Sequence, residues 1–342
     1  MIRRRTAPAR LAVVVLVLAA LALSACGSKK DVTTTTGGAA RIDLVLDYLP
    51  NADHAPIYAA QAIGAFKAAG LDVRIRTPSD PAAPLKLVQS GQADVAISYE
   101  PEVLLARDKG ARVAAIGALV QKPLTSIMSL DKDFKSVKDL KNAKVGTAGI
   151  PYQTAYLKTI AEANGVDASS ISEINVGFNL VPSMLSKKVD ATLGAFWNYE
   201  GVQLQRRHKD PTIIKMDQVG VPTYQELVFV ANMDRLREKG YGAVMRRFLQ
   251  AVSRGAKAVK ADPAVGADAL VKADPDLDRG LQLAAIKATL PVFFPEDTSF
   301  PFGYMNADEW KAYGQWMLDN KLVGSLPTPT SLTNEFLPGR GI

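Results

Sequence analysis

Residues 42–76 have the sequence IDLVLDYLPNADHAPIYAAQAIGAFKAAGLDVRIR. Residues 42–47 and 71–76 are short, mainly apolar segments, and the alanine-rich segment between them, residues 56–69, ends at Gly70. Short apolar segments predict strands, whereas a longer segment that stops at glycine predicts a helix. A strand, a helix and a second strand in this order indicate a parallel βαβ unit, in which the helix covers one face of the sheet.

The same alternation continues along the chain and then starts again. Two such sets of strands and helices predict an α/β protein with two lobes and a ligand cleft between them. The first set is completed by helices at residues 84–89 and 101–109 and strands at 94–98 and 112–120. The second set has strands at residues 143–147, 174–177, 190–194 and 212–216 and helices at 136–141, 152–163 and 181–186.

The lobes are expected to be built from separate parts of the chain. We assign residues 41–124 and 232–342 to lobe 1 and residues 131–225 to lobe 2. Two extended apolar segments, residues 125–130 and 226–231, are predicted to be the hinge. The remainder of the chain is predicted to wrap lobe 1 with helices at residues 241–260, 263–273, 277–289 and 307–320.

The N-terminus has the pattern of an export signal. Four arginines precede an apolar run at residues 11–23, which is shorter than the ~20 residues needed to span a bilayer. Small residues then lead to Cys26, so we interpret residues 1–25 as a lipoprotein signal peptide and Cys26 as the lipidated residue. Residues 26–40 are predicted to be a flexible tether. The alternative is an ordinary signal peptide with a free cysteine.

This N-terminus predicts an exported chain, lipid-anchored at the outer face of the cytoplasmic membrane. The formal net charge of +7 includes four arginines of the signal, and without residues 1–25 the chain has 37 basic and 34 acidic residues. So small an excess argues against nucleic acid as a partner. Cys26 is the only cysteine, which excludes a structural disulfide. We expect a monomer.

The candidate ligand site lies in four loops. In open parallel sheets, ligands bind beyond the carboxyl ends of the strands, and the segments at those positions are residues 47–54, 99–100, 149–152 and 196–200. Their aromatic, amide and carboxylate groups suit a small, flat, polar heterocycle. The candidate residues are Asp47, Tyr48, Asn51, His54, Tyr99, Glu100, Tyr152, Trp197, Asn198 and Glu200.

Several of these residues have a structural alternative. Trp197 could be a core aromatic, His54 could cap the helix that starts near Pro56, and Asp47 could accept hydrogen bonds from its own loop. Glu100 also suits an acidic helix start. The sequence has no dinucleotide-binding glycine motif, no phosphate-binding loop, no nucleophile elbow and only two histidines. We therefore expect no cofactor, no metal and no catalytic residue.

Residues 47–58 resemble the start of ThiY-type proteins, the substrate-binding components of ABC importers for thiamine pyrimidine precursors. Residues 97–107, 118–124, 149–158 and 195–201 extend the resemblance. It implies a type II periplasmic-binding-protein fold, as in SsuA-like proteins, an ABC permease as partner, and formylaminopyrimidine or hydroxymethylpyrimidine as ligand. The ligand ring would stack between Tyr48 and Trp197, with Glu200 at its aminopyrimidine edge and Asn51, His54 and Tyr99 near its substituents.

Two departures from the family pattern keep related ligands open. Tyr48 stands where tryptophan is commoner, and Tyr199 stands where histidine is expected. The alternatives are another heteroaromatic, such as a flavin precursor, or a nitrate- or sulfonate-type anion, although the four loops contain no arginine. The same fold also includes the thiamine-pyrimidine synthase, which has lysine and histidine where this chain has Ser98 and Glu102. Those replacements predict that this chain is not an enzyme.

Overall fold

The computed structural model describes residues 38–326 and 329–339. The predicted signal peptide, the lipidation at Cys26 and most of the tether lie outside these residues. In the described part, no helix is both long and apolar enough to cross a membrane.

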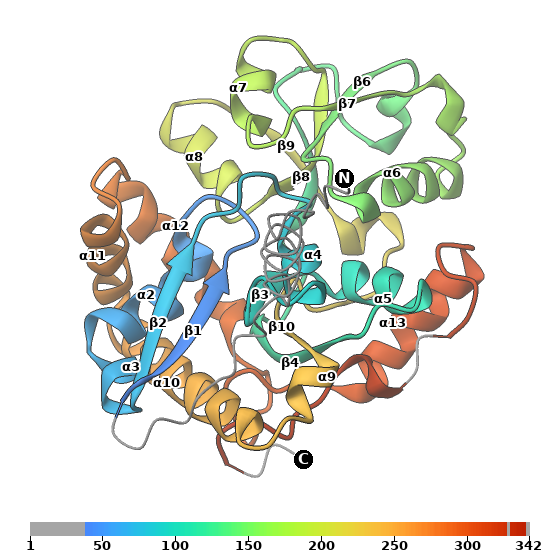
Figure 1. Ribbon diagram of the computed structural model, residues 1–342. Helices are drawn as coiled ribbons and strands as arrows, with labels where there is room; N and C mark the ends of the chain where they lie inside the picture. Colours follow the sequence, from blue (N-terminus) through green and yellow to red (C-terminus); the bar gives the residue numbers. More distant parts are fainter. Residues whose placement is uncertain (1–37, 327–328, 340–342) are drawn as a thin grey trace, which may run out of the picture. The chain divides into compact units, whose positions relative to one another are not determined.

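The first sheet has the strand order β2-β1-β3-β10-β4 (Figure 1). Strand β1 is parallel to β2 and β3, and β10 is antiparallel to both β3 and β4. Strand β4 is buried along its whole length, which explains its continuous apolar sequence. The strands are β1 (Ala40–Val45), β2 (Leu71–Arg76), β3 (Val95–Ser98), β4 (Val113–Val120) and β10 (Leu227–Asn232).

The second sheet repeats this plan with the order β7-β6-β8-β5-β9. Strand β6 is parallel to β7 and β8, and β5 is antiparallel to both β8 and β9. The antiparallel strand of each sheet, β10 in the first and β5 in the second, is the first strand that the chain forms there after it has left the other sheet. The strands are β5 (Thr125–Ser129), β6 (Lys144–Thr147), β7 (Ser172–Asn175), β8 (Ala191–Phe196) and β9 (Thr212–Lys215). We call the halves built on the two sheets the first and the second lobe.

The chain crosses between the sheets twice, and a carboxylate joins the two crossings. Oε2 of Glu226 accepts hydrogen bonds from the amides of Leu124 and Thr125, at 2.6 and 2.8 Å, and Oε1 accepts one from the Thr125 hydroxyl. The expected hinge segments largely coincide with β5 and β10, which are strands inside the two sheets. The lobe boundaries and the hinge remain predictions.

The helices follow the predicted order with local differences. The helix expected at residues 136–141 is a 3-10 helix at Val137–Leu140. The helix expected at residues 56–69 is interrupted at Gly64, whose φ of +74° is left-handed. Helix α12 continues through Pro291, and α8 and α9 were not predicted. The helices are α2 (Ala55–Ala62), α3 (Ala65–Ala68), α4 (Pro84–Gln89), α5 (Glu100–Asp108), α6 (Pro151–Ala163), α7 (Leu180–Leu185), α8 (Glu200–Arg206), α9 (Met233–Leu236), α10 (Tyr241–Ala261), α11 (Pro263–Ala273), α12 (Arg279–Phe293) and α13 (Ala307–Asp319).

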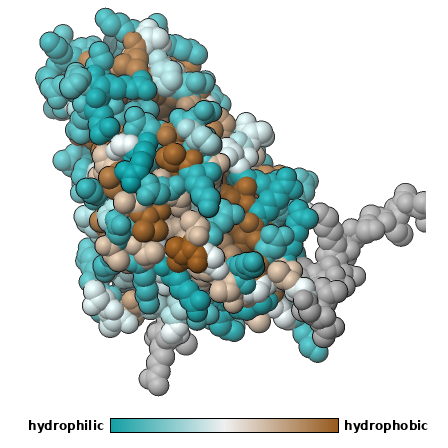
Figure 2. All heavy atoms as spheres, turned by 90° about the vertical axis from the view of Figure 1, so that its left-hand side faces the viewer, coloured by the Kyte–Doolittle hydropathy of each residue, from teal (hydrophilic) through white to brown (hydrophobic). Residues whose placement is uncertain are grey.

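The C-terminal helices α10 and α11 pack against α2 of the first lobe (Figure 1). Helix α10 lies so close to α2 that a Cβ at Gly255 would overlap the carbonyl oxygen of Pro56. This contact fixes α2, and with it the loop that follows β1. The face shown in Figure 2 is mostly hydrophilic, with hydrophobic groups across its middle. Large apolar side chains are exposed only singly among the described residues, at Leu49, Ile63, Leu185 and Leu326.

Candidate functional site

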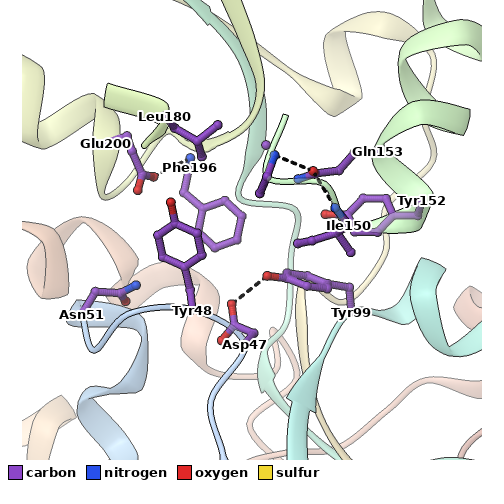
Figure 3. Close-up of a pocket in the computed structure, with 12 residues that line it drawn as sticks. Asp47, Tyr48, Asn51, Tyr99, Ile150, Tyr152, Gln153, Leu180, Phe196 and Glu200 are labelled. Atoms are coloured by element: carbon purple, nitrogen blue, oxygen red, sulfur yellow. Dashed lines mark hydrogen bonds between the residues drawn. The ribbon is translucent and has the colours of Figure 1, made fainter. Parts of the chain in front are cut away.

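A pocket lies between the two lobes, at the carboxyl ends of β1, β3, β6 and β8 (Figure 3). The space in it that a water-sized sphere can enter is about 20 Å³, room for about one water molecule, so the lining side chains nearly fill the pocket in this conformation. The rule that ligands bind beyond the carboxyl ends of parallel strands, here called the strand-end rule, had predicted this position. The lining residues are Asp47, Tyr48, Asn51, Tyr99, Ala148, Ile150, Tyr152, Gln153, Leu180, Gly194, Phe196 and Glu200.

The Asp47 carboxylate is held by two side chains of its own lobe. Oδ1 lies 2.8 Å from Nε2 of His54, and Oδ2 accepts a hydrogen bond of 2.8 Å from the Tyr99 hydroxyl. The backbone amide of Asn51 donates to Nδ1 of His54, so Nε2 is the ring nitrogen that donates to Asp47. Asp47 therefore lines the pocket with both oxygens already bonded to protein groups, and it orients the ring of Tyr99.

His54 supports this arrangement from behind and does not line the pocket. Its ring is fully buried and belongs to a capping box of the short 3-10 helix Ala52–His54, with Asn51 as the N-cap. The side chain of Asn51 accepts a hydrogen bond of 2.8 Å from the amide of Asp53. Asn51 lines the pocket, whereas His54 contacts it only through Asp47.

One wall of the pocket combines aromatic rings with a carboxyl group. Tyr48, Phe196 and Glu200 all line the pocket, and Figure 3 shows the Tyr48 hydroxyl pointing toward the Glu200 carboxyl group. The ring of Tyr48 packs edge-on against Phe178, with centroids 4.9 Å apart. Burial, together with the charges of Glu200 and Asp47, raises the pKa of Tyr48, so its hydroxyl stays neutral.

Glu200 begins helix α8 and is nearly buried in this wall. Its Oε2 accepts a hydrogen bond of 2.8 Å from the amide of Phe196. Burial raises the pKa of Glu200 to about 7, against the lowering effect of its backbone hydrogen bonds. Oε1 has no hydrogen bond to another described residue. Glu200 therefore offers the pocket an oxygen whose protonation can change near neutral pH.

The structure does not bring Trp197 to the pocket. Its Nε1 donates to the carbonyl oxygen of Pro123 at 3.0 Å, and Nζ of Lys215 lies 4.1 Å from the ring centroid. Phe196, one residue earlier, lines the pocket instead. The reason is that successive side chains at a strand end point to opposite faces, and β8 ends at Phe196.

Glu100 and Asn198 also lie outside the pocket lining. Oε2 of Glu100 accepts a hydrogen bond of 2.8 Å from the amide of Gln225, just before β10, and burial raises its pKa well above the ordinary value. Nδ2 of Asn198 donates to Oδ1 of Asp53 and to the Thr289 hydroxyl, each at 2.6 Å. Glu100 thus holds a crossing segment, and Asn198 joins the two lobes.

The structure thus places six of the ten predicted residues in the lining: Asp47, Tyr48, Asn51, Tyr99, Tyr152 and Glu200. The lining residues that the prediction missed are Ala148, Ile150, Gln153, Leu180, Gly194 and Phe196. Ile150 and Phe196 lie inside the predicted loops but are apolar. Leu180 comes from a helix start, which the strand-end rule does not cover. Gln153, three residues after the N-cap of α6, has the position of a capping-box residue.

Ser98 and Glu102 form a hydrogen-bonded pair outside the lining. The Ser98 hydroxyl donates to Oε2 of Glu102 at 2.5 Å, and burial raises the pKa of Glu102 to about 7. No group of three or more metal-ligating side chains occurs among residues 38–326 and 329–339.

Comparisons with known proteins agree with this architecture. Residues 51–265 match the family described as NMT1/THI5 like. The chain is 32% identical over 308 residues to the formylaminopyrimidine-binding protein of Halalkalibacterium halodurans, covering 89% of this chain and 92% of the relative. It is 25% identical over 304 residues to the 4-amino-5-hydroxymethyl-2-methylpyrimidine phosphate synthase of Legionella pneumophila, covering 87% and 92%.

A solved structure shows the same fold. The alkanesulfonate-binding protein SsuA from Xanthomonas axonopodis pv. citri, bound to MOPS, superposes with a TM-score of 0.65 at 13% identity. The match covers 86% of this chain and 99% of that protein. At this identity the likeness concerns the fold, which is that of the periplasmic binding proteins, as predicted.

Proposed function

The chain belongs to the NMT1/THI5-like family, and on this premise we propose that it is the substrate-binding lipoprotein of an ABC importer for a thiamine pyrimidine precursor. Its ligand is formylaminopyrimidine or hydroxymethylpyrimidine, and its partner is the membrane permease. Cys26 carries the lipid anchor at the outer face of the cytoplasmic membrane, and the mature chain acts as a monomer. The relative at 32% identity, a formylaminopyrimidine-binding protein, supports this ligand class.

The ligand assignment rests on the carboxyl group of Glu200, which lines the pocket and has a raised pKa. An aminopyrimidine presents an amine and a ring nitrogen side by side, and a carboxyl group can pair with both. Because the pKa of Glu200 is raised to about 7, this carboxyl group can share one proton with the ring nitrogen at neutral pH. The ring then lies against Tyr48 and Phe196, which replaces Trp197 of the sequence-based prediction.

The charge of the pocket disfavours an anion. Two carboxyl groups, Asp47 and Glu200, line it, and neither lysine nor arginine is present among its described lining residues. A sulfonate or nitrate would therefore meet like charges without a compensating cation. The fold shared with SsuA does not extend to its ligand.

The same lining supports a binding role over a synthase. The described lining contains no lysine for a Schiff base, and no histidine or cysteine. Ser98 and Glu102, at the positions expected to differ from the enzyme, bond to each other instead of facing the pocket.

Calorimetric titration of the mature protein tests the proposal. We expect binding of formylaminopyrimidine or hydroxymethylpyrimidine and no binding of an alkanesulfonate. Glu200→Gln should weaken pyrimidine binding about 10- to 100-fold, since a charge-assisted pair contributes about 1.5–3 kcal/mol. Glu102→Gln is the matched control, a similarly buried carboxyl group outside the lining, and should change affinity less than about threefold. Binding of the sulfonate without the pyrimidines would refute the proposal.

A further inference from the structure

The amide of Gln153 has a defined orientation at the edge of the pocket. Its Oε1 accepts hydrogen bonds from the backbone amides of Ala148, at 2.9 Å, and Ile150, at 3.4 Å (Figure 3). Backbone N–H groups only donate, so the side-chain atom that faces them must be the oxygen. The Nε2 group is consequently turned away from the loop, toward the interior of the pocket.

The Nε2 group lies against a residue without a side chain. A Cβ at Gly194 would overlap Nε2 of Gln153, and both residues line the pocket. Gly194 has a φ of +114°, a conformation that favours glycine. No described residue accepts a hydrogen bond from Nε2, although Gln153 is 2% exposed. The pocket therefore contains a fixed donor that lacks a protein acceptor.

This donor makes the two sides of the pocket chemically different. Figure 3 shows Gln153 and Glu200, both from the second lobe, at opposite ends of the pocket. Glu200, when ionised, can only accept hydrogen bonds, whereas Nε2 of Gln153 can only donate. A well-matched ligand carries its amine at Glu200 and an acceptor at Gln153. Leaving a nearly buried donor without a partner is unfavourable, so ligands that lack such an acceptor bind less tightly.

Resting on the proposed function, we propose that Gln153 is a specificity-determining residue that donates a hydrogen bond from Nε2 to a carbonyl oxygen of the ligand. In a formylaminopyrimidine this oxygen belongs to the formamide group. A carbonyl oxygen only accepts, whereas the hydroxyl of hydroxymethylpyrimidine accepts or donates by rotation. Gln153 therefore favours a ligand with an acceptor at this position, and only the carbonyl ligand loses its hydrogen bond when the donor is replaced by an acceptor. Gly194 provides the space for the amide.

Gln153→Glu tests this role with little change in shape. The introduced carboxyl group keeps an oxygen for the amides of Ala148 and Ile150 and replaces the Nε2 group with a second oxygen. Titrations at pH 8 keep the new group ionised. We expect the affinity for formylaminopyrimidine to fall at least about tenfold, and that for hydroxymethylpyrimidine to change less than about threefold, because its hydroxyl can turn to donate.

A second pair of variants separates the role in binding from helix capping. Gly194→Ala places a methyl group where Nε2 lies. As in Gln153→Glu, the affinity for formylaminopyrimidine should fall relative to that for hydroxymethylpyrimidine. Gly165→Ala is its control, because Gly165 also has a positive φ, +75°, but no atom within 4 Å of an added Cβ. It should leave the ratio unchanged.

The outcomes are distinguishable. If Gln153→Glu weakened the binding of both pyrimidines equally, the side chain would only cap α6. If it changed neither affinity, Nε2 would not contact the ligand. A wild type that binds hydroxymethylpyrimidine but not formylaminopyrimidine would also overturn the role of Gln153, while leaving the proposed function intact. A wild type that binds neither would overturn the proposed function itself.

Discussion

The two lobes meet on opposite sides of the pocket, and the two contacts differ in chemistry. On one side, α8 and the residues before it meet α12, and on the other, α6 meets α13 (Figure 1). We call the first the polar flank, formed by Asp53, Asn198 and Thr289. We call the second the aromatic flank, formed by Tyr152, Tyr156, Tyr224, Tyr313 and Trp316. Each flank joins the lobes in a way that suggests a different part in closure.

The polar flank consists of hydrogen bonds between buried groups. Nδ2 of Asn198, from the second lobe, bridges Asp53 and Thr289 of the first. Oδ2 of Asp53 and Oδ1 of Asn198 have no hydrogen-bonding partner among the described residues. When the lobes separate, water can replace each of these bonds, so the free energy of opening at this side is small.

The aromatic flank consists of rings in contact. The centroid of Tyr156 lies 5.1 Å from that of Tyr152, 6.1 Å from Tyr224 and 5.8 Å from Trp316. The Tyr224 hydroxyl donates to Glu226, the carboxylate that joins the two chain crossings. Separation here would expose large apolar surfaces to water, which is unfavourable. We therefore expect the lobes to pivot at the aromatic flank and to open at the polar one.

The largest effect is expected from Tyr156→Ala. Removing this fully buried ring should lower the free energy of unfolding by about 3–5 kcal/mol, measured by urea denaturation. Tyr156→Phe is the control, because the Tyr156 hydroxyl has no partner in the described chain, and it should change stability by less than about 1 kcal/mol. Equal destabilisation by both variants would show that a hydrogen bond, and not ring packing, holds this flank.

A smaller effect, concentrated in ligand binding, is expected from Asn198→Ala. In this variant Oδ1 of Asp53 keeps only its hydrogen bond from the Thr289 hydroxyl. The lost hydrogen bond should destabilise the closed arrangement of the lobes by about 1–3 kcal/mol. If the polar flank forms on closure, pyrimidine affinity falls about tenfold or more. Titration calorimetry measures this change. Tyr199→Phe, which removes one bond to Gln282 on the same flank, should have a weaker effect. An unchanged affinity in Asn198→Ala would contradict a role of this flank in closure.

The pH dependence of stability should change in Asp53→Asn. Burial raises the pKa of Asp53 from 3.8 to about 7. Between these values the folded chain holds a proton that the unfolded chain releases, so this residue lowers stability as pH rises from about 4 to about 7. Asp53→Asn removes this contribution, and its melting temperature should vary less across the window, by a few degrees. The pKa of Glu200 is raised as well, so some of this pH dependence should remain in the variant. If the melting temperatures of the wild type and Asp53→Asn varied with pH in parallel, Asp53 would be excluded as a contributor.

The smallest effect is expected from Trp197→Phe, which lies outside the pocket lining. The variant keeps an aromatic ring for Lys215 and loses one hydrogen bond to Pro123, so pyrimidine affinity should change less than about threefold. Phe196→Ala is the comparison and should weaken binding about tenfold or more. A larger loss in Trp197→Phe than in Phe196→Ala would restore the stacking role that the sequence had indicated.

The order of strands and helices was predictable from the sequence because it depends on local patterns. Apolar runs, glycine stops and proline at helix starts located nearly every element, and strand β2 and helix α11 have the predicted bounds. The strand-end rule then placed the pocket, and Asp47, Tyr48, Tyr99 and Glu200 line it. These predictions needed only the chain direction and the chemistry of neighbouring residues.

Contacts between distant segments were decided by tertiary structure alone. Whether Phe196 or Trp197 faces the pocket depends on where β8 ends. The orientation of the Gln153 amide depends on the loop at residues 148–150 and on Gly194, which lies 41 residues further along. Asn198 meets Asp53 across 145 residues. Composition and periodicity carry no signal for such pairs, because packing of the two sheets, and not local preference, brings them within hydrogen-bonding distance.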